Sequence, residues 1–333
     1  MKSEETKRIE AYHAGPFLWL TDYLCLLPVY LRMKRRMTSF ELTYIDGKRK
    51  EIENDFKHGA TFITNHRDII CDPAFFCYKM RLRYNIRPYM GIGNNLFKKW
   101  WIEPLVRYNR CYVVIRDGSP RDALQHATIL SKYIHHLVER KQCIWIAQRE
   151  GRAKDSNDRT QPAVLKMLTL ADADDFLAAV RHLNIVPVSL NYEYDPCDYL
   201  KAKEFQQRRD NPDFKKGPKD DLLSMTTGMW GEKGKVVFRM TPSINHWLDI
   251  HEEELRQLPK NEQIAAVAAQ IDHQIHYAYE MYARGEKFER YLQQQLAKID
   301  LPDKDEAYLM ERLREMYNNP VINYEKSHLS GII

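Results

Sequence analysis

The chain has 333 residues, of which 44% are hydrophobic and 29% are charged, and its formal net charge is +5. This balance is typical of a globular protein and excludes a disordered tail, a collagen and a coiled-coil rod. The length suits one large domain with an appendage, or two domains. The six cysteines form no C-x-x-C pair and no metal-binding spacing, which favours a reducing compartment.

The most apolar stretch covers residues 16–31, and no cleavable signal peptide is predicted before it. It contains Asp22 and Pro28 and is shorter than the roughly 20 apolar residues that span a bilayer. Residues 32–36 then carry four cations, a pattern typical of a helix lying in the interface of an anionic membrane. We therefore expect membrane association, peripheral or monotopic, on the cytoplasmic face. The alternative is a helix packed on the domain with a solvated charged end.

Short apolar runs alternate with helical patterns between residues 56 and 195. Apolar runs of this length suit strands buried on both faces, and apolar residues at three- and four-residue spacing predict a helix over 121–140. The predicted strands are 60–64, 111–115, 143–147, 185–190 and 235–240. Residues 206–222 are predicted to form an exposed loop. The pattern predicts an α/β fold, a layered domain with a mostly parallel sheet flanked by helices.

From about residue 246 the pattern is helical, including a helix over 304–317. We therefore expect three parts along the chain. They are an N-terminal membrane-surface segment over 1–55, an α/β domain over 56–245 and a helical extension over 246–333. On these helices His273 and His276 are one turn apart, but no third ligand is evident, so a solvated face is expected rather than a metal site.

The first block with chemical character follows the predicted strand over 60–64. It contains His66 and, a few residues later, Asp68 and Asp72. With Pro73 at the first helical position, Asp72 is expected to be a helix N-cap. Ligands bind at the carboxyl ends of strands in α/β sheets. A His beside a carboxylate at this place is a candidate general base, and a loop His bonded to a capping Asp is the alternative.

Arginines follow two other predicted strands. Arg116 comes at the end of the strand over 111–115, and Arg149 and Arg152 follow the strand over 143–147. Guanidinium groups bind phosphate through a planar fork, and Gly151 between the latter two lets backbone approach a ligand closely. Singly, each block is also compatible with a solvated loop.

Residues 81–110 contain seven cations, a single acid and two adjacent tryptophans. Such a segment suits anionic lipid headgroups, an acidic acyl-carrier protein or nucleic acid, and a solvated helix is the alternative. No nucleic-acid-binding module is evident in the sequence, so no nucleic-acid partner is expected.

Taken in chain order, four blocks resemble the motifs of the glycerolipid acyltransferase family, which includes glycerol-3-phosphate and lysophosphatidic acid acyltransferases. The blocks are Asn65-His66 to Asp72, Val114-Ile115-Arg116, Arg149-Glu150-Gly151-Arg152 and Ile185-Val186-Pro187-Val188. They correspond to the family's N-H-(x)4-D, I-x-R or I-R, P-E-G-T-R-like and V-P-V/I-P-like motifs. Two departures are that five residues separate His66 from Asp72, and that Gln148-Arg149 stands where Phe-Pro is usual.

The resemblance implies an O-acyltransferase of phospholipid synthesis that needs no cofactor and no metal. The donor would be acyl-CoA or acyl-carrier protein, and the acceptor an anionic glycerolipid, glycerol 3-phosphate or lysophosphatidic acid, at a membrane surface. His66 would deprotonate the acceptor hydroxyl, with Asp72, or alternatively Asp68, orienting the imidazole. The substrate-binding residues implied are Asn65, Arg116, Arg149, Glu150, Gly151 and Arg152.

Because the chain has no Ser in a G-x-S-x-G elbow, direct attack on the thioester is expected rather than an acyl-enzyme. Two alternatives keep the fold. One is an acyltransferase that acts on a lyso-aminolipid, and the other is a non-catalytic membrane-binding protein.

Overall fold

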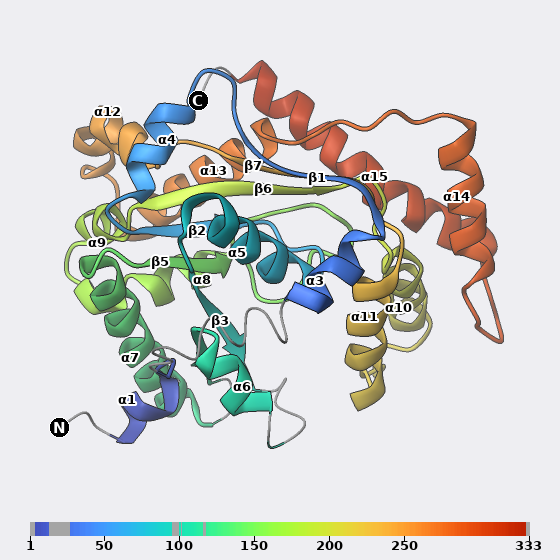
Figure 1. Ribbon diagram of the computed structural model, residues 1–333, viewed down its shortest axis with the longest axis horizontal. Helices are drawn as coiled ribbons and strands as arrows, with labels where there is room; N and C mark the ends of the chain where they lie inside the picture. Colours follow the sequence, from blue (N-terminus) through green and yellow to red (C-terminus); the bar gives the residue numbers. More distant parts are fainter. Residues whose placement is uncertain (1–3, 13–26, 95–99, 101, 116–117, 331–333) are drawn as a thin grey trace.

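One mixed sheet organises the molecule, as seen in the computed structural model, which describes residues 4–12, 27–94, 100, 102–115 and 118–330 (Figure 1). The strands are β1 (Met37–Tyr44), β2 (Ala60–Thr64), β3 (Tyr89–Gly93), β4 (Cys111–Val114), β5 (Cys143–Ala147), β6 (Ile185–Tyr192) and β7 (Gly234–Met240). Their order across the sheet is β1-β7-β6-β2-β5-β3-β4. The strands from β6 to β4 are parallel to one another, β7 is antiparallel to β6, and β1 is parallel to β7. The predicted α/β fold with a mostly parallel sheet is confirmed.

Helices flank this sheet and account for most of the remaining chain (Figure 1). In chain order they are α1 (Glu4–Ile9), α3 (Leu27–Lys34), α4 (Arg49–Phe56), α5 (Cys71–Tyr84), α6 (Ile102–Tyr108), α7 (Pro120–Glu139), α8 (Pro162–Leu168), the short 3-10 helix η4 (Leu170–Asp172), α9 (Phe176–Leu183), α10 (Asp198–Asp210), α11 (Pro218–Trp230), α12 (Asn245–Leu255), α13 (Lys260–Tyr277), α14 (Glu286–Ala297) and α15 (Glu306–Leu329). The predicted helix over 121–140 is α7. It starts at a capping box in which the Ser119 hydroxyl accepts from the backbone N–H of Asp122, while Pro120 occupies the first turn.

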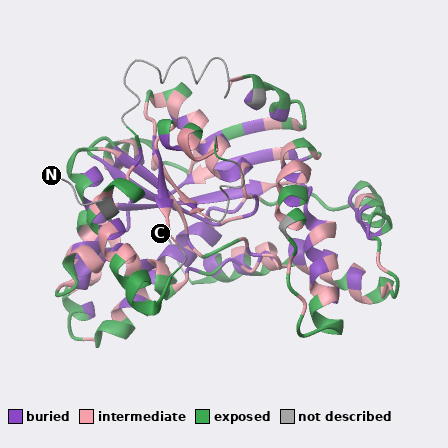
Figure 2. Ribbon diagram, turned by 90° about the horizontal axis from the view of Figure 1, so that it is seen from below, coloured by how far each residue is buried: buried purple, intermediate pink, exposed green. Residues whose placement is uncertain are grey.

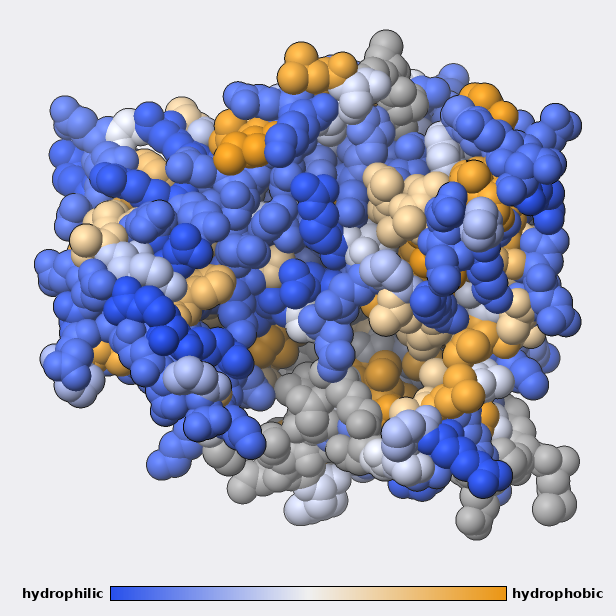
Figure 3. Space-filling model, turned by 180° about the vertical axis from the view of Figure 1, so that it is seen from behind, coloured by the Kyte–Doolittle hydropathy of each residue, from blue (hydrophilic) through white to orange (hydrophobic). Residues whose placement is uncertain are grey.

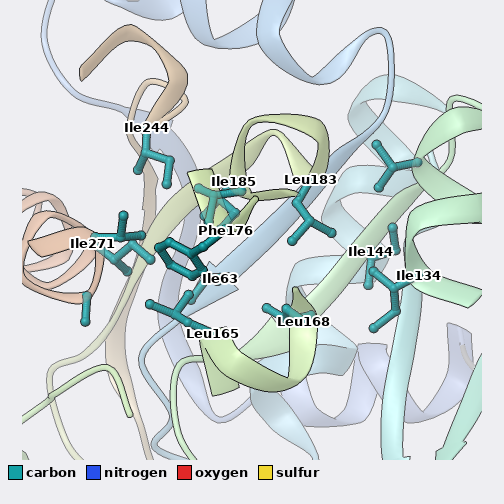
Figure 4. Close-up of a cluster of buried hydrophobic side chains, with 14 of the residues drawn as sticks. Ile63, Ile134, Ile144, Leu165, Leu168, Phe176, Leu183, Ile185, Ile244 and Ile271 are labelled. Atoms are coloured by element: carbon teal, nitrogen blue, oxygen red, sulfur yellow. The ribbon is translucent and has the colours of Figure 1, made fainter. Parts of the chain in front are cut away.

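The two faces of the sheet carry separate hydrophobic clusters. Alternate residues of each central strand point to opposite faces, as the two-residue period of a strand requires. On one face Ile63, Ile144 and Ile185 pack against α7, α8, α9 and α13. Figure 4 shows Ile144 beside Ile134 of α7, and Ile63 near Leu165 of α8. On the other face α3, α4 and α5 cover the sheet, and Phe76 of α5 packs against Phe62 of β2. The central strands β2 and β6 are therefore buried along nearly all of their length (Figure 2).

A third hydrophobic cluster lies among α10, α14 and α15. At its edge the carboxylate of Asp198 accepts hydrogen bonds from the hydroxyls of Tyr291 (2.8 Å) and Tyr317 (2.7 Å). Helix α13, by contrast, contacts β6 and shares the main core. On the surface, the face opposite to that of Figure 1 is mostly hydrophilic, with hydrophobic side chains exposed in smaller patches (Figure 3).

Part of the predicted secondary structure is wrong. The expected exposed loop over 206–222 contains the last turns of α10 and the first turns of α11, and only residues 211–217 connect the two helices. The Gly217-Pro218 pair marks the start of a helix rather than a loop, because proline fits the first helical turn. Strands β1 and β3 were not predicted. β3 contains two glycines, which are depleted in strands, and β1 is an edge strand with only partial burial.

The predicted interfacial segment lies largely outside the described residues, since only 27–31 of residues 16–31 are described. These residues begin α3, which packs Tyr30 and Met33 into the core. The cations that follow, Arg32 and Lys34 to Arg36, are exposed. Among the described residues, no helix combines the length and the apolar character needed to cross a bilayer.

We predict that Asp198→Asn changes the pH dependence of folding stability. Burial, and then the nearby Asp195, raise the pKa of Asp198 to about 7, whereas an unfolded chain has an Asp pKa of about 3.9. Between these values the folded state binds a proton that the unfolded state does not, so this contribution to the free energy of unfolding falls as pH rises. Asparagine does not titrate. As pH rises across this window, the free energy of unfolding of the variant should therefore increase relative to that of the wild type by on the order of 4 kcal/mol.

Urea unfolding of both proteins at several pH values measures this difference, in which the contributions of other titrating groups cancel. A difference that stays constant from acidic to neutral pH would contradict the assignment.

Candidate active site

Two loops meet at the carboxyl edge of the parallel strands. Strands β2 and β5 are parallel neighbours, so the segments that follow them leave the sheet side by side. The backbone N–H of Gln148 donates to the carbonyl of Thr64 (2.8 Å), and that of Ala153 donates to the carbonyl of His66 (3.1 Å). This pairing places the loop after β5 directly against the loop that carries His66.

His66 is held by the carboxylate of Asp72. Its Nδ1 lies 2.8 Å from Oδ2 of Asp72, which also accepts from the backbone N–H groups of Arg67 (2.6 Å) and Asp68 (3.0 Å). Oδ1 of the same carboxylate accepts from the Tyr192 hydroxyl (2.8 Å) at the end of β6. With Nδ1–H donated to Asp72, the ring has Nε2 left to accept a proton. The sequence did not point to Tyr192, although its position at the end of a strand parallel to β2 is a usable signal.

The second carboxylate, Asp68, contacts the start of α5 instead. Its Oδ1 accepts from the backbone N–H groups of Ile70 (2.9 Å) and Cys71 (2.7 Å). The expected role of Asp72 as N-cap is therefore wrong, because α5 begins at Cys71 and Asp72 lies inside its first turn. Burial, and then the neighbouring Asp72, raise the pKa of Asp68. Of the two candidate partners, Asp72 is the one in contact with His66.

The predicted substrate-binding residues in the loop after β5 do not all face the pocket. Arg149, Glu150 and Gly151 line the same pocket as His66. Gly151 has a φ of +66°, a left-handed conformation that favours glycine, although a Cβ there would meet no atom within 4 Å. The charge of Arg152 partly offsets the rise in the pKa of Asp68 that burial causes.

Of the other predicted substrate-binding residues, Arg152 and Asn65 are absent from the pocket lining, and a third is not described. Asn65 is buried, and its side chain exchanges two hydrogen bonds with the backbone of Leu190, at 2.7 and 3.0 Å. It therefore extends the pairing of β2 with β6 and is absent from the pocket lining. Arg116 lies outside the described residues.

The pocket itself is large and mostly apolar. Its volume is about 700 Å³, within the range typical of small-molecule sites. Residues of α3, α5, β3, α6, β5 and α8 line it, so it extends from His66 beneath α5 toward the start of β3. Trp145 forms part of the wall, with its ring edge-on to His66 at a centroid distance of 6.0 Å. At the His66 end the lining becomes polar, with Arg149, Glu150 and Gln161.

No metal centre is evident in the described part of the chain, since no group of three or more His, Cys, Asp or Glu side chains there is arranged to hold an ion. The expectation that His276 lies on a solvated face is wrong. It is buried, and its Nε2 lies 2.8 Å from the backbone carbonyl of Asp158. Burial lowers its pKa to about 3, so the ring is neutral and structural.

We predict that Gly228→Ala lowers the free energy of unfolding, because the added methyl group would overlap with Asp68 beside the candidate site. Gly228 in α11 faces Asp68, and a Cβ at this position would lie 1.8 Å from Oδ2 of that carboxylate. An alanine in an exposed helix interior normally stabilises by up to about 1 kcal/mol relative to glycine, but here the overlap should cost about 1–3 kcal/mol. Thr226→Ala in the same helix is the control and should be close to neutral. If Gly228→Ala unfolds at the same urea concentration as the wild type or a higher one, the contact between α11 and the His66 loop is not as described.

No protein-family model matches the chain, and no curated protein sequence matches it. The comparisons therefore show no family, and the function has to be argued from the site. Its features are a His–Asp pair at the edge of a sheet, an apolar pocket in front of it and Arg149 at the polar end of that pocket.

Proposed function

We propose that the protein is an acyltransferase that moves a fatty acyl group from a thioester, acyl-CoA or acyl-carrier protein, to the hydroxyl of glycerol 3-phosphate or lysophosphatidic acid. The observation that carries the proposal is the position of the His66–Asp72 pair at the polar end of an apolar pocket of about 700 Å³. This arrangement supplies a base where a carbonyl carbon at the head of a buried chain would lie. The four motifs that resemble the glycerolipid acyltransferases support the same reaction.

The chemistry needs only this pair. Nε2 of His66 accepts the proton of the acceptor hydroxyl while the oxygen attacks the thioester carbonyl. The C–S bond of the resulting tetrahedral intermediate then breaks, and the imidazolium returns the proton to the departing sulfur. A thiol has a pKa of about 8.5, so its departure is not demanding. Asp72 stabilises the imidazolium and keeps the ring oriented.

The pocket suits the acyl chain of the donor. Residues such as Ile70, Val164 and Met167 line it from α8 and the segment that begins α5. Each methylene that leaves water on entering such a lining contributes about 0.8 kcal/mol. We expect a saturated chain to bind along this lining with its carbonyl directed to the polar end at which His66 lies.

The arginines suit an anionic acceptor. Arg149 lines the pocket, and its Nε is buried and has no hydrogen-bond partner among the residues that the structure describes. The same holds for Nη1 of Arg152, which follows the pocket residue Gly151 in the loop but is not itself in the lining. Buried donors of this kind are costly unless a ligand satisfies them. The phosphate oxygens of glycerol 3-phosphate or lysophosphatidic acid are matched acceptors for guanidinium groups.

A lipid surface beside the pocket completes the proposal. Helices α3 and α11 both contribute to the pocket lining, through Tyr30 and Met225. They adjoin one another where Arg32 of α3 stacks over the ring of Trp230 in α11, at 5.1 Å. On α11, Leu222 and Leu223 are 60% and 48% exposed. Apolar side chains beside exposed cations are typical of a surface that binds an anionic membrane.

We predict that purified protein forms the ester product and that His66→Ala lowers the rate by about 10²–10⁴-fold. Labelled acyl-CoA and acyl-carrier protein should be tested against glycerol 3-phosphate, lysophosphatidic acid and lyso-aminolipids, with products identified by mass. His246→Ala is the matched control, because His246 is an exposed histidine whose Nε2 lies 2.9 Å from Asp55. It should leave the rate unchanged.

Three results would change the assignment. If product forms only with lyso-aminolipids, the acceptor is an aminolipid rather than a glycerol phosphate, and the assignment as an acyltransferase stands. Equal loss in both histidine variants would remove His66 as the base. Absence of any product with all donors would favour a non-catalytic membrane-binding protein.

We predict that Leu222→Ser/Leu223→Ser reduces membrane binding. Cosedimentation with vesicles containing phosphatidylglycerol should show at least a fivefold weaker partition than the wild type, because two exposed leucines no longer leave water. Ile250→Ser is the control, since Ile250 is 78% exposed on α12, at the other end of the molecule (Figure 1). Equal binding by the two variants would exclude α11 from the membrane surface.

A further inference from the structure

The side chain of Asp158 binds both chain neighbours of His66. It is fully buried, in the loop that follows β5, 91 residues after Arg67. Its Oδ2 lies 2.6 Å from Nη2 of Arg67 and 3.2 Å from Nδ2 of Asn65, and both groups donate to it. One carboxylate oxygen therefore fixes the residues on either side of His66.

The same carboxylate is anchored to a third part of the chain. The Tyr279 hydroxyl, just beyond α13, donates to Oδ2 of Asp158, and the ring of His276 within α13 contacts its backbone carbonyl at 2.8 Å. Asp158 belongs to the loop that carries Arg149 and Arg152. It thus joins the His66 loop, the arginine loop and α13 at one buried point.

A contribution to folding stability does not by itself explain the buried ion pair between Arg67 and Asp158. Replacing a buried ion pair by apolar residues of similar volume is often neutral or stabilising, because removing two charges from water offsets their attraction. What a buried pair with several hydrogen bonds does supply is one fixed geometry. In a site where a base must meet a hydroxyl, a displacement of about 1 Å can cost about 10²-fold in rate.

We propose that Asp158 is a positioning residue, which through Arg67 and Asn65 sets the place of His66 relative to the arginine loop. This inference rests on the proposed function, because it assigns Asp158 a part in the same reaction. Asp158 lies behind the His66 loop and is not among the residues that line the pocket, so it acts through its neighbours and not on substrate.

The structure supplies a matched control in Asp272. This carboxylate is also buried, and its Oδ1 accepts two hydrogen bonds from Thr160, both at 2.7 Å, in the same loop as Asp158. Among the residues that the structure describes, it makes no hydrogen bond or ion pair with Asn65, His66 or Arg67. Asp272→Asn therefore removes a buried carboxylate of α13 that binds the same loop, and leaves the support of His66 in place.

The test compares Asp158→Asn with Asp272→Asn in the full-length protein. Asp158→Asn should lower kcat by about 10–100-fold, with the KM for the acyl donor changed less than threefold. Asp272→Asn should change kcat less than threefold. Arg67→Met and the double variant Arg67→Met/Asp158→Asn should have similar kcat values, since two residues that act as one unit are not additive.

A second readout does not depend on activity. In Asp158→Asn the amide protons of Arg67 and Asp68, which are bonded to Asp72, should exchange at least tenfold faster, while those of the β2 strand remain as in the wild type. If these amides exchange as in the wild type, or if Asp272→Asn lowers kcat equally, the positioning role is overturned. A different result is also informative. If the wild type shows no acyl transfer but these amides exchange faster in Asp158→Asn, the proposed function is overturned, whereas the role of Asp158 in holding the His66 loop is supported.

Discussion

The carboxylate of Asp72 is the interaction on which the candidate site depends. One of its oxygens binds the imidazole of His66 and two successive backbone N–H groups, and the other binds Tyr192. It therefore joins the loop after β2, the first turn of α5 and the end of β6. With so many donors converging on it, the carboxylate has a single position, and the ring that it orients has a single free nitrogen.

The sheet explains why these groups meet. Strands β6, β2, β5, β3 and β4 run in the same direction, so the loops that follow them gather at one edge. Hydrophobic clusters on both faces fix the strands, and the apolar pocket opens beside α5. A carboxylate-bound histidine, an apolar pocket and Arg149 are thereby brought together from segments that are far apart along the chain.

The sequence predicts this fold where the pattern is local. The apolar runs over 60–64 and 143–147 coincide with β2 and β5, because a fully buried strand leaves a continuous hydrophobic signal. The glycines of β3 and the polar helices α10 and α11 carry no such signal. The sequence favours Asp72 over Asp68 as the partner of His66 but leaves both open, since the contact depends on how the loop after β2 folds. The bond between Arg67 and Asp158 joins residues 91 apart, which no local pattern reveals.

The central claim is direct transfer from thioester to hydroxyl, with His66 as the base and no covalent intermediate. The most direct measurement follows thiol release and intact-protein mass after labelled acyl-CoA is added, with and without the acceptor. We expect thiol to appear only with acceptor present, one for each ester formed, and the protein mass never to increase. Thiol release without acceptor, accompanied by an acyl adduct on the protein, would contradict it.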